Sequence, residues 1–468
     1  MSTVHLDSPL LVSKLEVEPE AVGVLGELVS AVARAMVERG VPHAFLRGHE
    51  KLPQVRLGSD IDISVPSAHQ ALFEELLGQA CAEHAARVWQ RHRAGFLTQL
   101  QLHARTPDGK HSFLSIDVHN SEACFGVPFL EQEQLCVEGE TSPSGLRVPP
   151  VTVLSVANFM GPYLSGGVVK KEFADALQHN LKEAPAALRS ILRTLLGPSM
   201  SALFLQHVAE GRVLELQQMA RSVRRKLLLR RVLRAPLRSL SGCLQFAYGA
   251  RIRPIWRPRG LFLAFLGTDG AGKSTVLEAV EETLRPVFRS NLSQTWHLRT
   301  KVIPQLDTLL HLGRSTYTDT DMVRPHRAKP SGALLSNVRV AYYWVDYVVG
   351  HLCNVLPRRR RQSLILFDRY YHDYLVDPLR CRVRRNTWMV RFLEPWVPAP
   401  DQVIVVSASY ETVRSRKQEL SPEESAFQIA AYETLAVSEP GFALVHNEGT
   451  VEESVDAVLD VVFGGVSE

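Results

Sequence analysis

The chain has 468 residues, of which 45% are hydrophobic and 22% are charged, and its formal net charge is +4. This composition excludes a disordered or fibrous protein, and the length exceeds what one hydrophobic core supports, so we expect two or three domains. No apolar run reaches the roughly 18–20 residues of a membrane-spanning helix, no secretory signal is present at the N-terminus, and the six cysteines form no CxxC pair. We therefore expect a cytoplasmic protein with reduced thiols.

Three regions follow one another along the chain. Residues 1–150 mix helical and strand-like patterns and end in a turn-rich segment. Residues 151–258 carry apolar residues at three-to-four spacing, which predicts a helical connector. Residues 259–468 alternate short apolar strands with helices, the pattern of a parallel sheet covered by helices on both faces. We predict an α+β N-terminal domain, a helical connector and an α/β C-terminal domain.

Paired acids lie in the N-terminal region. Asp60 and Asp62 stand in a strand-like run, so their side chains share one face of the strand. Two neighbouring carboxylates disfavour joint ionisation unless a cation lies between them, and Mg²⁺ is the natural occupant. A third acid, Asp117, lies in a later strand-like run. The sequence predicts a metal site formed by these three aspartates; a surface strand with two solvated aspartates is the alternative.

The spacing of these residues is itself informative. Gly48, an Asp-x-Asp pair beginning twelve residues later, and the distant Asp117 resemble the nucleotidyltransferase superfamily of the polymerase-β type over about 100 residues. The resemblance implies a nucleotidyltransferase-like domain in which the aspartates hold the metal. His49 stands where a small Ser or Gly usually helps to hold the triphosphate. The domain could therefore transfer nucleotides or only bind them.

The connector is strongly basic. No Asp or Glu occurs from residue 216 to residue 268, while twelve Arg and Lys residues lie between Arg221 and Arg259. Cations interspersed with leucines indicate a basic amphipathic helix that contacts an anionic membrane surface. We do not expect nucleic acid as the partner, because aromatic interleaving and known binding motifs are absent from the sequence. An ordinary solvated connector is the remaining alternative.

A phosphate-binding loop opens the C-terminal region. The apolar run 261–266 predicts a buried strand and leads into a full GxxxxGKS match, with a helical pattern after it. Glycines let backbone N–H groups approach phosphates, the lysine reaches the β- and γ-phosphate oxygens, and the serine hydroxyl ligates Mg²⁺. The residues expected to bind ATP are Gly267, Gly270, Gly272, Lys273, Ser274 and Thr275.

Two later strands carry polar residues at their ends. Residues 364–367 predict a strand that ends in Asp368 and Arg369. An acid at the carboxyl end of a parallel strand lies where ligands bind in open α/β sheets, so we expect Asp368 to hold Mg²⁺ together with Ser274. A third strand follows Pro400 and Asp401, and a basic helix comes after it.

These features together resemble the thymidylate kinase family over about 200 residues, from residue 261 onward. The resemblance rests on a P-loop containing an acid (Asp269), the Asp-Arg-Tyr strand end, the Pro-Asp strand, a basic lid and a late tyrosine, Tyr432. It implies that Asp269 contacts the phosphate acceptor and that Asp368 and Arg369 organise Mg²⁺ and phosphoryl groups. The lid residues expected to close over ATP are Arg414, Arg416 and Lys417. For Tyr432 we favour a packing role over a catalytic one.

Other segments depart from a plain deoxythymidylate enzyme. Residues 296–299, 323–326, 336–350 and 370–378 resemble divergent thymidylate-kinase-like proteins of bacterial surface-polysaccharide pathways. The acceptor therefore stays open as a nucleotide, a sugar or a related small molecule. His297, Arg299 and His326 could bind an anionic acceptor or could be structural.

The sequence thus predicts an ATP-dependent phosphotransferase with a nucleotidyltransferase-like N-terminal domain. One alternative is a true deoxythymidylate kinase with an extra domain, and another is a regulatory ATP-binding protein that transfers nothing. Asp269 and the basic lid favour transfer, because a switch protein needs no acid facing an acceptor. The oligomeric state is open, with a homodimer among the options, and for Arg221–Arg259 peripheral membrane contact is an option beside the ordinary solvated connector.

Overall fold

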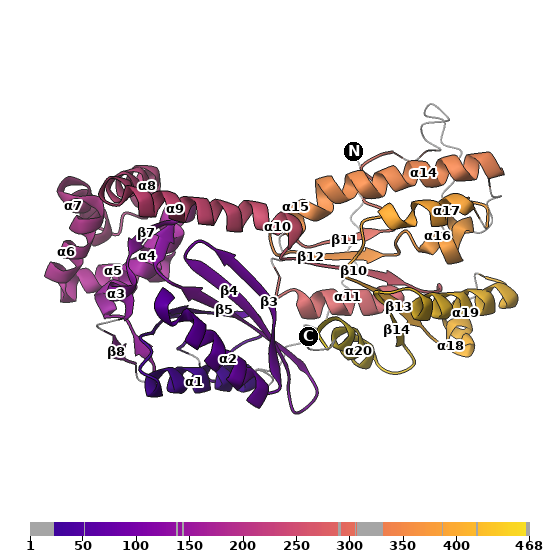
Figure 1. Ribbon diagram of the computed structural model, residues 1–468, viewed down its shortest axis with the longest axis horizontal. Helices are drawn as coiled ribbons and strands as arrows, with labels where there is room; N and C mark the ends of the chain where they lie inside the picture. The colour runs from indigo at the N-terminus through magenta and orange to yellow at the C-terminus, as the bar shows by residue number, and fades with distance from the viewer. Residues whose placement is uncertain are drawn as a thin grey trace, which may run out of the picture.

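The computed structural model describes residues 23–50, 52–136, 139–142, 145–288, 292–304, 306, 331–385, 387–417 and 420–464. The chain forms two lobes, each built on a five-stranded sheet, and a long run of helices connects them (Figure 1). The predicted segment containing Arg324 and His326 lies outside the described residues.

The N-terminal sheet is mixed. Its strands in spatial order are β1 (Ala44–Arg47), β2 (Ser59–Ser64), β5 (His111–His119), β4 (Leu97–Arg105) and β3 (Ala86–Ala94). Only the β2–β5 pair is parallel. Helices α1 (Gly23–Glu38) and α2 (Gln70–Glu83) share one hydrophobic core with this sheet, which includes Ile61 and Ile63. Because side chains alternate along a strand, Asp60 and Asp62 face away from those helices.

A set of helices follows the sheet. The intervening elements are β6 (Glu122–Cys124), β7 (Val127–Leu130), α3 (Gln132–Cys136), β8 (Glu140–Thr141) and β9 (Arg147–Val148). The helices are α4 (Val151–Gly166), α5 (Lys171–Glu183), α6 (Pro185–Leu196), α7 (Pro198–Ala209) and α8 (Val213–Arg234). They pack into a second core that also takes Leu46 of β1 and Phe129 of β7, so the helices are continuous with the N-terminal lobe.

A basic helical segment crosses from the first lobe to the second. It comprises α9 (Pro236–Ala247), a π-helical turn η3 (Tyr248–Ile252) and α10 (Arg253–Trp256). In Figure 1 it runs along the upper side of the molecule toward α15 (Leu356–Arg359). None of the helices in the described parts of the chain is both long and apolar enough to cross a bilayer.

The C-terminal sheet is wholly parallel, as the alternation of strands and helices predicts. Its order is β11 (Gln294–His297), β12 (Leu364–Asp368), β10 (Leu261–Leu266), β13 (Gln402–Ser407) and β14 (Phe442–His446). The helices on one face are α11 (Lys273–Leu284) and α20 (Val451–Phe463). Those packed in the core of the other face are α14 (Ala333–Gly350), α16 (Asp373–Val376), α17 (Trp388–Leu393) and α19 (Pro422–Ser438). The predicted α/β sheet with helices on both faces is confirmed.

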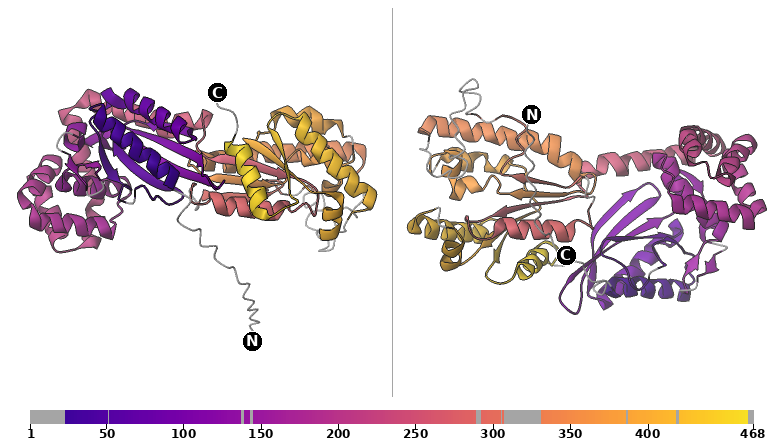
Figure 2. Two further views of the ribbon diagram at one scale, coloured as in Figure 1. Left: turned by 90° about the horizontal axis from the view of Figure 1, so that it is seen from below. Right: turned by 180° about the vertical axis from the view of Figure 1, so that it is seen from behind.

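The open face of the N-terminal sheet packs against the second lobe. Phe113 of β5 belongs to the core formed by α11 and α20, and its ring contacts that of Phe463 at a centroid distance of 4.8 Å. Arg105 of β4 binds both carboxylate oxygens of Asp460, at 2.8 and 2.7 Å. Figure 2 shows α11 and α20 beside the N-terminal sheet from behind. The predicted acidic face of the first lobe therefore looks toward the second lobe.

Candidate functional site

The P-loop links strand β10 to helix α11. Every residue of β10 is buried, which fixes the strand in the centre of the sheet. The loop lies close to its neighbours: a Cβ on Gly267 would lie 2.2 Å from the carbonyl oxygen of Val406, and its φ is +143°. Gly272, with φ of +83°, lies against Asn447, whose Nδ2 donates to the carbonyl oxygen of Ala271 at 2.8 Å. A side chain at either glycine would displace the backbone that receives the phosphates.

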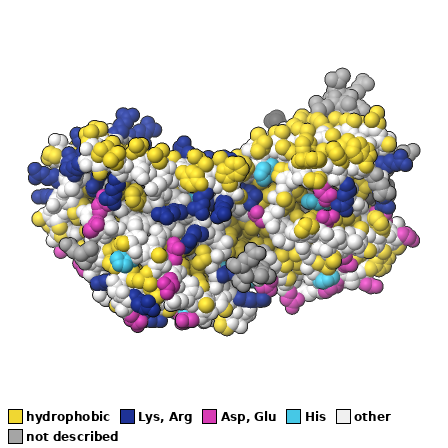
Figure 3. Space-filling model, viewed as in Figure 1, with side chains coloured by type: hydrophobic (Ala, Val, Ile, Leu, Met, Phe, Trp, Pro, Cys, Tyr) yellow, Lys and Arg dark blue, Asp and Glu magenta, His cyan; other side chains and the backbone are white. Residues whose placement is uncertain are grey.

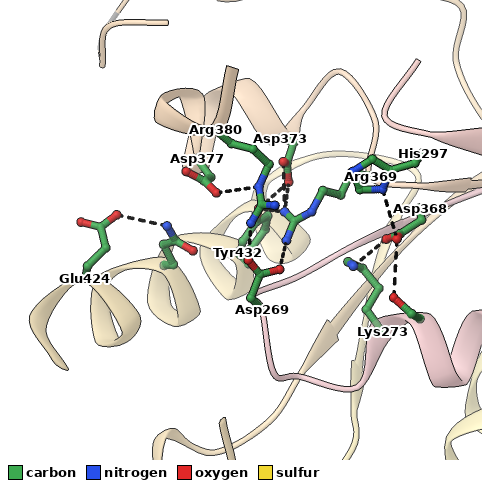
Figure 4. Close-up of polar contacts among 12 residues, drawn as sticks. Asp269, Lys273, His297, Asp368, Arg369, Asp373, Asp377, Arg380, Glu424 and Tyr432 are labelled. Carbon is green, nitrogen blue, oxygen red and sulfur yellow. Dashed lines mark hydrogen bonds and ion pairs between the residues drawn. The ribbon is translucent and has the colours of Figure 1, made fainter. Parts of the chain in front are cut away.

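Lys273 and Asp368 form the centre of the phosphate end of the site. Lys273 is 6% exposed, and its Nζ lies 2.5 Å from Oδ1 of Asp368. The other carboxylate oxygen lies 3.5 Å from Ser274 Oγ and 3.3 Å from His297 Nδ1 (Figure 4). Three elements, α11, β12 and β11, therefore meet at one carboxylate. Of these contacts, the sequence predicted that Ser274 and Asp368 act together, whereas the ion pair with Lys273 and the contact with His297 were not predicted.

The electrostatics keep Asp368 ionised. Burial alone would raise its pKa, but the hydrogen bond from His297 and the charge of Lys273 hold the pKa well below its usual range. Burial and the charge of Arg369 lower the pKa of Lys273, which Asp368 partly opposes. An ionised carboxylate beside a serine hydroxyl is a pair of hard oxygen ligands. Ser274 and Asp368 thus fit Mg²⁺, the ion that the sequence predicts for them.

A second charge network surrounds Asp269, the acid inside the P-loop. Its Oδ1 accepts from Arg369 at 2.6 Å, and its Oδ2 accepts from Arg380. Arg369 is 1% exposed and also donates to both oxygens of Asp373, at 2.8 and 3.0 Å. Burial would raise the pKa of Asp269, but the two guanidinium groups lower it well below its usual range. Both guanidinium groups therefore hold Asp269 ionised and fixed in position.

This network corrects the expected role of Arg369. The resemblance implied that Arg369 organises Mg²⁺ and phosphoryl groups, whereas the structure directs its guanidinium into a buried set of acids. The left-handed backbone of Arg369, with φ of +73°, turns the chain after Asp368 so that the two side chains diverge. Tyr432 belongs to the same network and donates its hydroxyl to Asp373. It is buried and packed against the sheet, in the packing role that we favoured.

The basic lid lies beside the P-loop. Helix α18 (Tyr410–Arg416) follows β13, and Nη1 of Arg416 lies 3.3 Å from where a Cβ of Gly272 would be. The Cβ of Lys417 lies 3.2 Å from the corresponding point at Gly270. Arg414 instead donates to the carbonyl oxygen of Leu420 at 2.8 Å. Of the three predicted lid cations, two lie next to the loop and Arg414 braces the turn after the helix.

Two further arginines have structural contacts: one was missed by the sequence reasoning, and the other takes the structural role that was left open for it. Arg380, in the short η7 segment (Pro378–Cys381), holds Asp269 and contacts Asp377 at 3.1 Å, and no motif in the sequence marks it. Arg299, a suggested acceptor ligand, is 5% exposed and donates to Asp346 at 2.9 Å. Its guanidinium also stacks on the Tyr343 ring, 3.9 Å from the centroid. Arg299 is therefore committed to joining β11 to α14.

A second cluster lies on the open face of the N-terminal sheet. Asp62 and Asp117 are paired in register on the parallel strands β2 and β5. Ligand atoms of these two aspartates and of His119 all lie within 4.8 Å of one another. Among the described residues this compact group contains His119 where we predicted Asp60. Asp60 instead borders a cavity of about 280 Å³ between the lobes, with Gln99, Asp117 and Phe288 among its lining residues.

Protein donors already contact this cluster. Both oxygens of Asp62 have partners, because Arg47 Nε contacts Oδ2 and His119 Nε2 lies 3.1 Å from Oδ1. Gln99 Nε2 donates to both oxygens of Asp117, at 3.1 Å each. Burial and the charges of Asp62 and Asp60 raise the pKa of Asp117 to about 6. The group has the carboxylates that a divalent cation needs, and binding one requires Arg47 and His119 to release Asp62.

Comparisons with known proteins give fold-level similarity alone. No protein-family model and no curated protein matches the chain. A thymidylate kinase from Ehrlichia chaffeensis is similar at 13% identity and a TM-score of 0.30, covering 44% of this chain and all of its own. A thymidylate kinase from Candida albicans is similar at 14% identity and a TM-score of 0.33, covering 44% of this chain and 91% of its own. Neither similarity assigns an acceptor to this site.

Proposed function

We propose that the C-terminal domain is an ATP-dependent phosphotransferase, thymidylate-kinase-like, that acts on a small acceptor. The observation that supports it is the pairing of two charge centres at the P-loop: Lys273 with Asp368, and Asp269 with two arginines. Phosphoryl transfer needs positioned cations around the moving group and little covalent chemistry. A loop that only binds ATP has no need for the second centre.

Each centre has a separate task in this proposal. Lys273 exchanges the carboxylate of Asp368 for the β- and γ-phosphate oxygens, while Ser274 and Asp368 turn toward the metal position. Mg²⁺ there supplies charge that screens the phosphates. Arg416 and Lys417, next to the loop glycines, stabilise negative charge that develops during transfer. Binding in the closed site excludes water, so that ATP is not hydrolysed before the acceptor arrives.

Asp269 and Arg380 form the acceptor side. Both oxygens of Asp269 accept from arginines, so its task is to hold Arg380 toward the space beside the P-loop. Arg380 offers a fixed guanidinium, which suits a phosphate or carboxylate on the acceptor. The segments that diverge from a plain deoxythymidylate enzyme support an acceptor of the nucleotide, sugar or related class, with surface-polysaccharide metabolism as its setting.

For the N-terminal domain we propose a nucleotidyltransferase-like role. The in-register pair of Asp62 and Asp117 on parallel strands supports it, because such pairs hold the metal in nucleotide transfer. His49, buried next to Gly48, leaves binding without transfer as the competing role.

An acceptor screen tests the kinase proposal. Purified full-length protein is mixed with Mg·ATP and with nucleoside monophosphates or sugars, and ATP consumption is followed, with Lys273→Ala as the blank. We expect one acceptor class to raise consumption at least about tenfold over ATP alone. For deoxythymidylate we expect a kcat/KM below about 10⁴ M⁻¹s⁻¹, and a higher value would favour a true deoxythymidylate kinase. ATP binding without transfer to any acceptor would favour the regulatory alternative.

A further inference from the structure

The helix that crosses between the lobes has its apolar residues on the outside. Small residues lie on its inner side: Gly242 approaches Gly126, and Gly249 approaches Ala94. Leu237 at 81% and Trp256 at 80% exposure mark the two ends of the outer side. The exposed apolar residues of this helix are Leu237, Leu240, Leu244, Tyr248, Ile252, Ile255 and Trp256. Their spacing of three to four residues forms one stripe, and the π-helical turn keeps Ile252 in line with Tyr248.

Helix α14 also has apolar residues on its exposed side, although its buried side packs Val340, Tyr343 and Tyr347 into the core. It buries the polar residues Ser336, Arg339 and Asp346, the last of which is the partner of Arg299. The exposed apolar residues along α14 and the turn after it are Leu334, Leu335, Val338, Val345 and Leu352. A surface helix of a globular protein normally places its charges outward and its apolar stripe inward. The additional apolar residues on the exposed sides of these two helices therefore indicate a surface that another phase or molecule covers.

These two stripes lie on one edge of the molecule. The backbone N–H groups of Arg259 and Gly260, just after α10, both donate at 3.1 and 2.7 Å to the carbonyl oxygen of Arg359, the last residue of α15, which continues the helical run of α14 through η6 (His351–Val355). The C-terminal ends of the two stripes are thus tied together. Figure 3 shows hydrophobic side chains gathered along this upper edge, above α9, α10 and α14. We call this surface, formed by the exposed apolar residues of α9–α10 and α14, the apolar edge.

Cations accompany the apolar edge, and the segment that forms most of α8 and all of α9 and α10 contains no acid. No Asp or Glu occurs from residue 216 to residue 268. Six exposed cations of α8–α10 have no ion pair with a carboxylate in the described part of the chain: Arg221, Arg225, Lys226, Arg234, Arg251 and Arg257. Figure 3 shows Lys and Arg side chains beside the hydrophobic ones at the α8 end. Like charges placed together without acids repel one another, so this arrangement favours an anionic partner.

We propose that the apolar edge binds an anionic membrane surface and holds the protein there peripherally. Leucines and Trp256 would enter the boundary between headgroups and acyl chains, and the cations would lie at the level of anionic headgroups. A second copy of the chain would bring two sets of cations together, which disfavours that occupant. Nucleic acid would leave the leucines without a partner. The helices would lie along the membrane surface and would not cross it, because cations are spread along the helical segment that carries the leucines.

Vesicle sedimentation with the full chain tests the proposal. Sucrose-loaded vesicles of phosphatidylcholine alone, or of phosphatidylcholine mixed with phosphatidylserine, are spun with purified protein. We expect sedimentation with the mixed vesicles and little with the neutral ones. Leu237→Glu with Leu244→Glu, two exposed positions whose change leaves the core intact, should lower the partition coefficient at least about tenfold. Val437→Glu, at an exposed apolar residue of α19, is the matched control and should change nothing.

Two further sets of variants in the same sedimentation assay test the contribution of the cations and that of α14. Arg225→Gln with Lys226→Gln should lower the partition about tenfold, and added salt should remove the difference. Val338→Glu with Leu352→Glu should weaken binding if α14 takes part, as proposed. Wild-type protein that stays in the supernatant with mixed vesicles overturns the proposal, and so do leucine variants that bind like wild type. A wild-type dimer that the leucine variants dissociate, without vesicle binding, would show that a second copy covers the edge.

Discussion

The two acidic sites of this molecule use the same residue types in opposite settings. Asp269 of the P-loop and Asp62 of the N-terminal sheet each accept from an arginine. Asp269 lies at the carboxyl edge of a parallel sheet, where loops leave space for ligands, and its arginine is itself held by Asp373. Asp62 lies on the flat face of a mixed sheet that looks toward the other lobe, and Arg47 is partly exposed.

The difference concerns what a ligand must displace. At the P-loop, Lys273 has a carboxylate partner that a phosphate can replace, so the site is charged and ready before ATP arrives. At the N-terminal cluster, Arg47 and His119 must release Asp62 before the group can hold a cation. The neighbouring cavity of about 280 Å³ is lined by Pro286 and Phe288 of the other lobe. The contacts that hold the P-loop site all come from the C-terminal domain. At the N-terminal cluster, the space next to the carboxylates depends on how the two lobes pack.

Loss of the P-loop lysine should give the largest effect. Lys273→Ala should lower the rate of phosphoryl transfer about a thousandfold, because it removes the fixed cation at the transferring phosphates. The fold should persist, since His297 and Ser274 still contact Asp368. Transfer is measured at saturating Mg·ATP with the acceptor found in the screen, and circular dichroism checks the fold. Lys171→Ala, at an exposed lysine of α5, is the control, and wild-type turnover by Lys273→Ala would refute the kinase assignment.

The buried ion pairs of Arg369 should contribute more to the free energy of unfolding than an exposed ion pair does. Arg369→Met leaves Asp269 and Asp373 without their shared cation in a buried site, which should cost about 3–5 kcal/mol of unfolding free energy. Arg385→Met removes an exposed pair with Glu424 and should cost at most about 1 kcal/mol. Urea unfolding of both variants gives the comparison. Equal costs would mean that the Arg369 network contributes no more than a surface ion pair.

The N-terminal cluster predicts a metal effect that is independent of the kinase. Asp62→Asn with Asp117→Asn should weaken Mn²⁺ binding to the full chain about a hundredfold and leave phosphoryl transfer unchanged. Isothermal calorimetry with Mn²⁺, with ATP absent, measures the first effect. Asp60→Asn should weaken binding less, because Asp60 lies outside the compact group. Unchanged Mn²⁺ affinity in the double variant would show that these carboxylates hold no metal.

The sequence predicted the C-terminal fold and the centre of its site well, for a physical reason. A P-loop requires glycines, a lysine and a serine at fixed spacing, and buried parallel strands have continuous apolar sequences. The sequence therefore named Lys273, Ser274 and Asp368, and the structure brings these three side chains together. Arg380 was missed because it lies in a segment with no regular period, and only the folded chain brings it to Asp269. The role of Arg299 stayed open between acceptor binding and structure because its partner Asp346 is 47 residues away.

In the N-terminal lobe, the sequence predicted which side chains share a face of a strand. It did not predict the strand register or the packing of the sheet against the other lobe. Alternation placed Asp60 and Asp62 on one face, and the structure agrees. Which acids lie closest depends on the register of β2 with β5, and that register pairs Asp62 with Asp117. It also places His119 beside them, at the next position on the same face. Packing of this face against the other lobe has no signature in either segment alone, since it depends on residues as distant as Phe113 and Phe463.

The smallest expected effect is a pH dependence of stability. It concerns the contact between the N-terminal sheet and α20, which we call the seam between the lobes and which contains a buried histidine. His103 of β4 lies in this seam, with its Nε2 2.8 Å from Nδ1 of His111 and its ring stacked on Phe463. His111 in turn lies 3.5 Å from Asp460. Burial lowers the pKa of His103 from its ordinary 6.5 to about 3, and the charges of His111, Arg87 and Arg105 act in the same direction. The folded protein therefore keeps this imidazole neutral.

Because the folded pKa is below the unfolded one, the seam has its full stability above about pH 6.5 and loses it as the pH falls toward 3. At about pH 5 the loss from His103 alone should be about 2 kcal/mol. In His103→Gln, which cannot take up a proton, the fall in unfolding free energy between about pH 7 and about pH 5 should shrink by that amount. His179→Gln, at an exposed histidine of α5, controls for the loss of one imidazole, and urea unfolding at both pH values measures all three proteins. An unchanged pH dependence in His103→Gln would mean that folding does not lower the pKa of His103 and would refute this prediction.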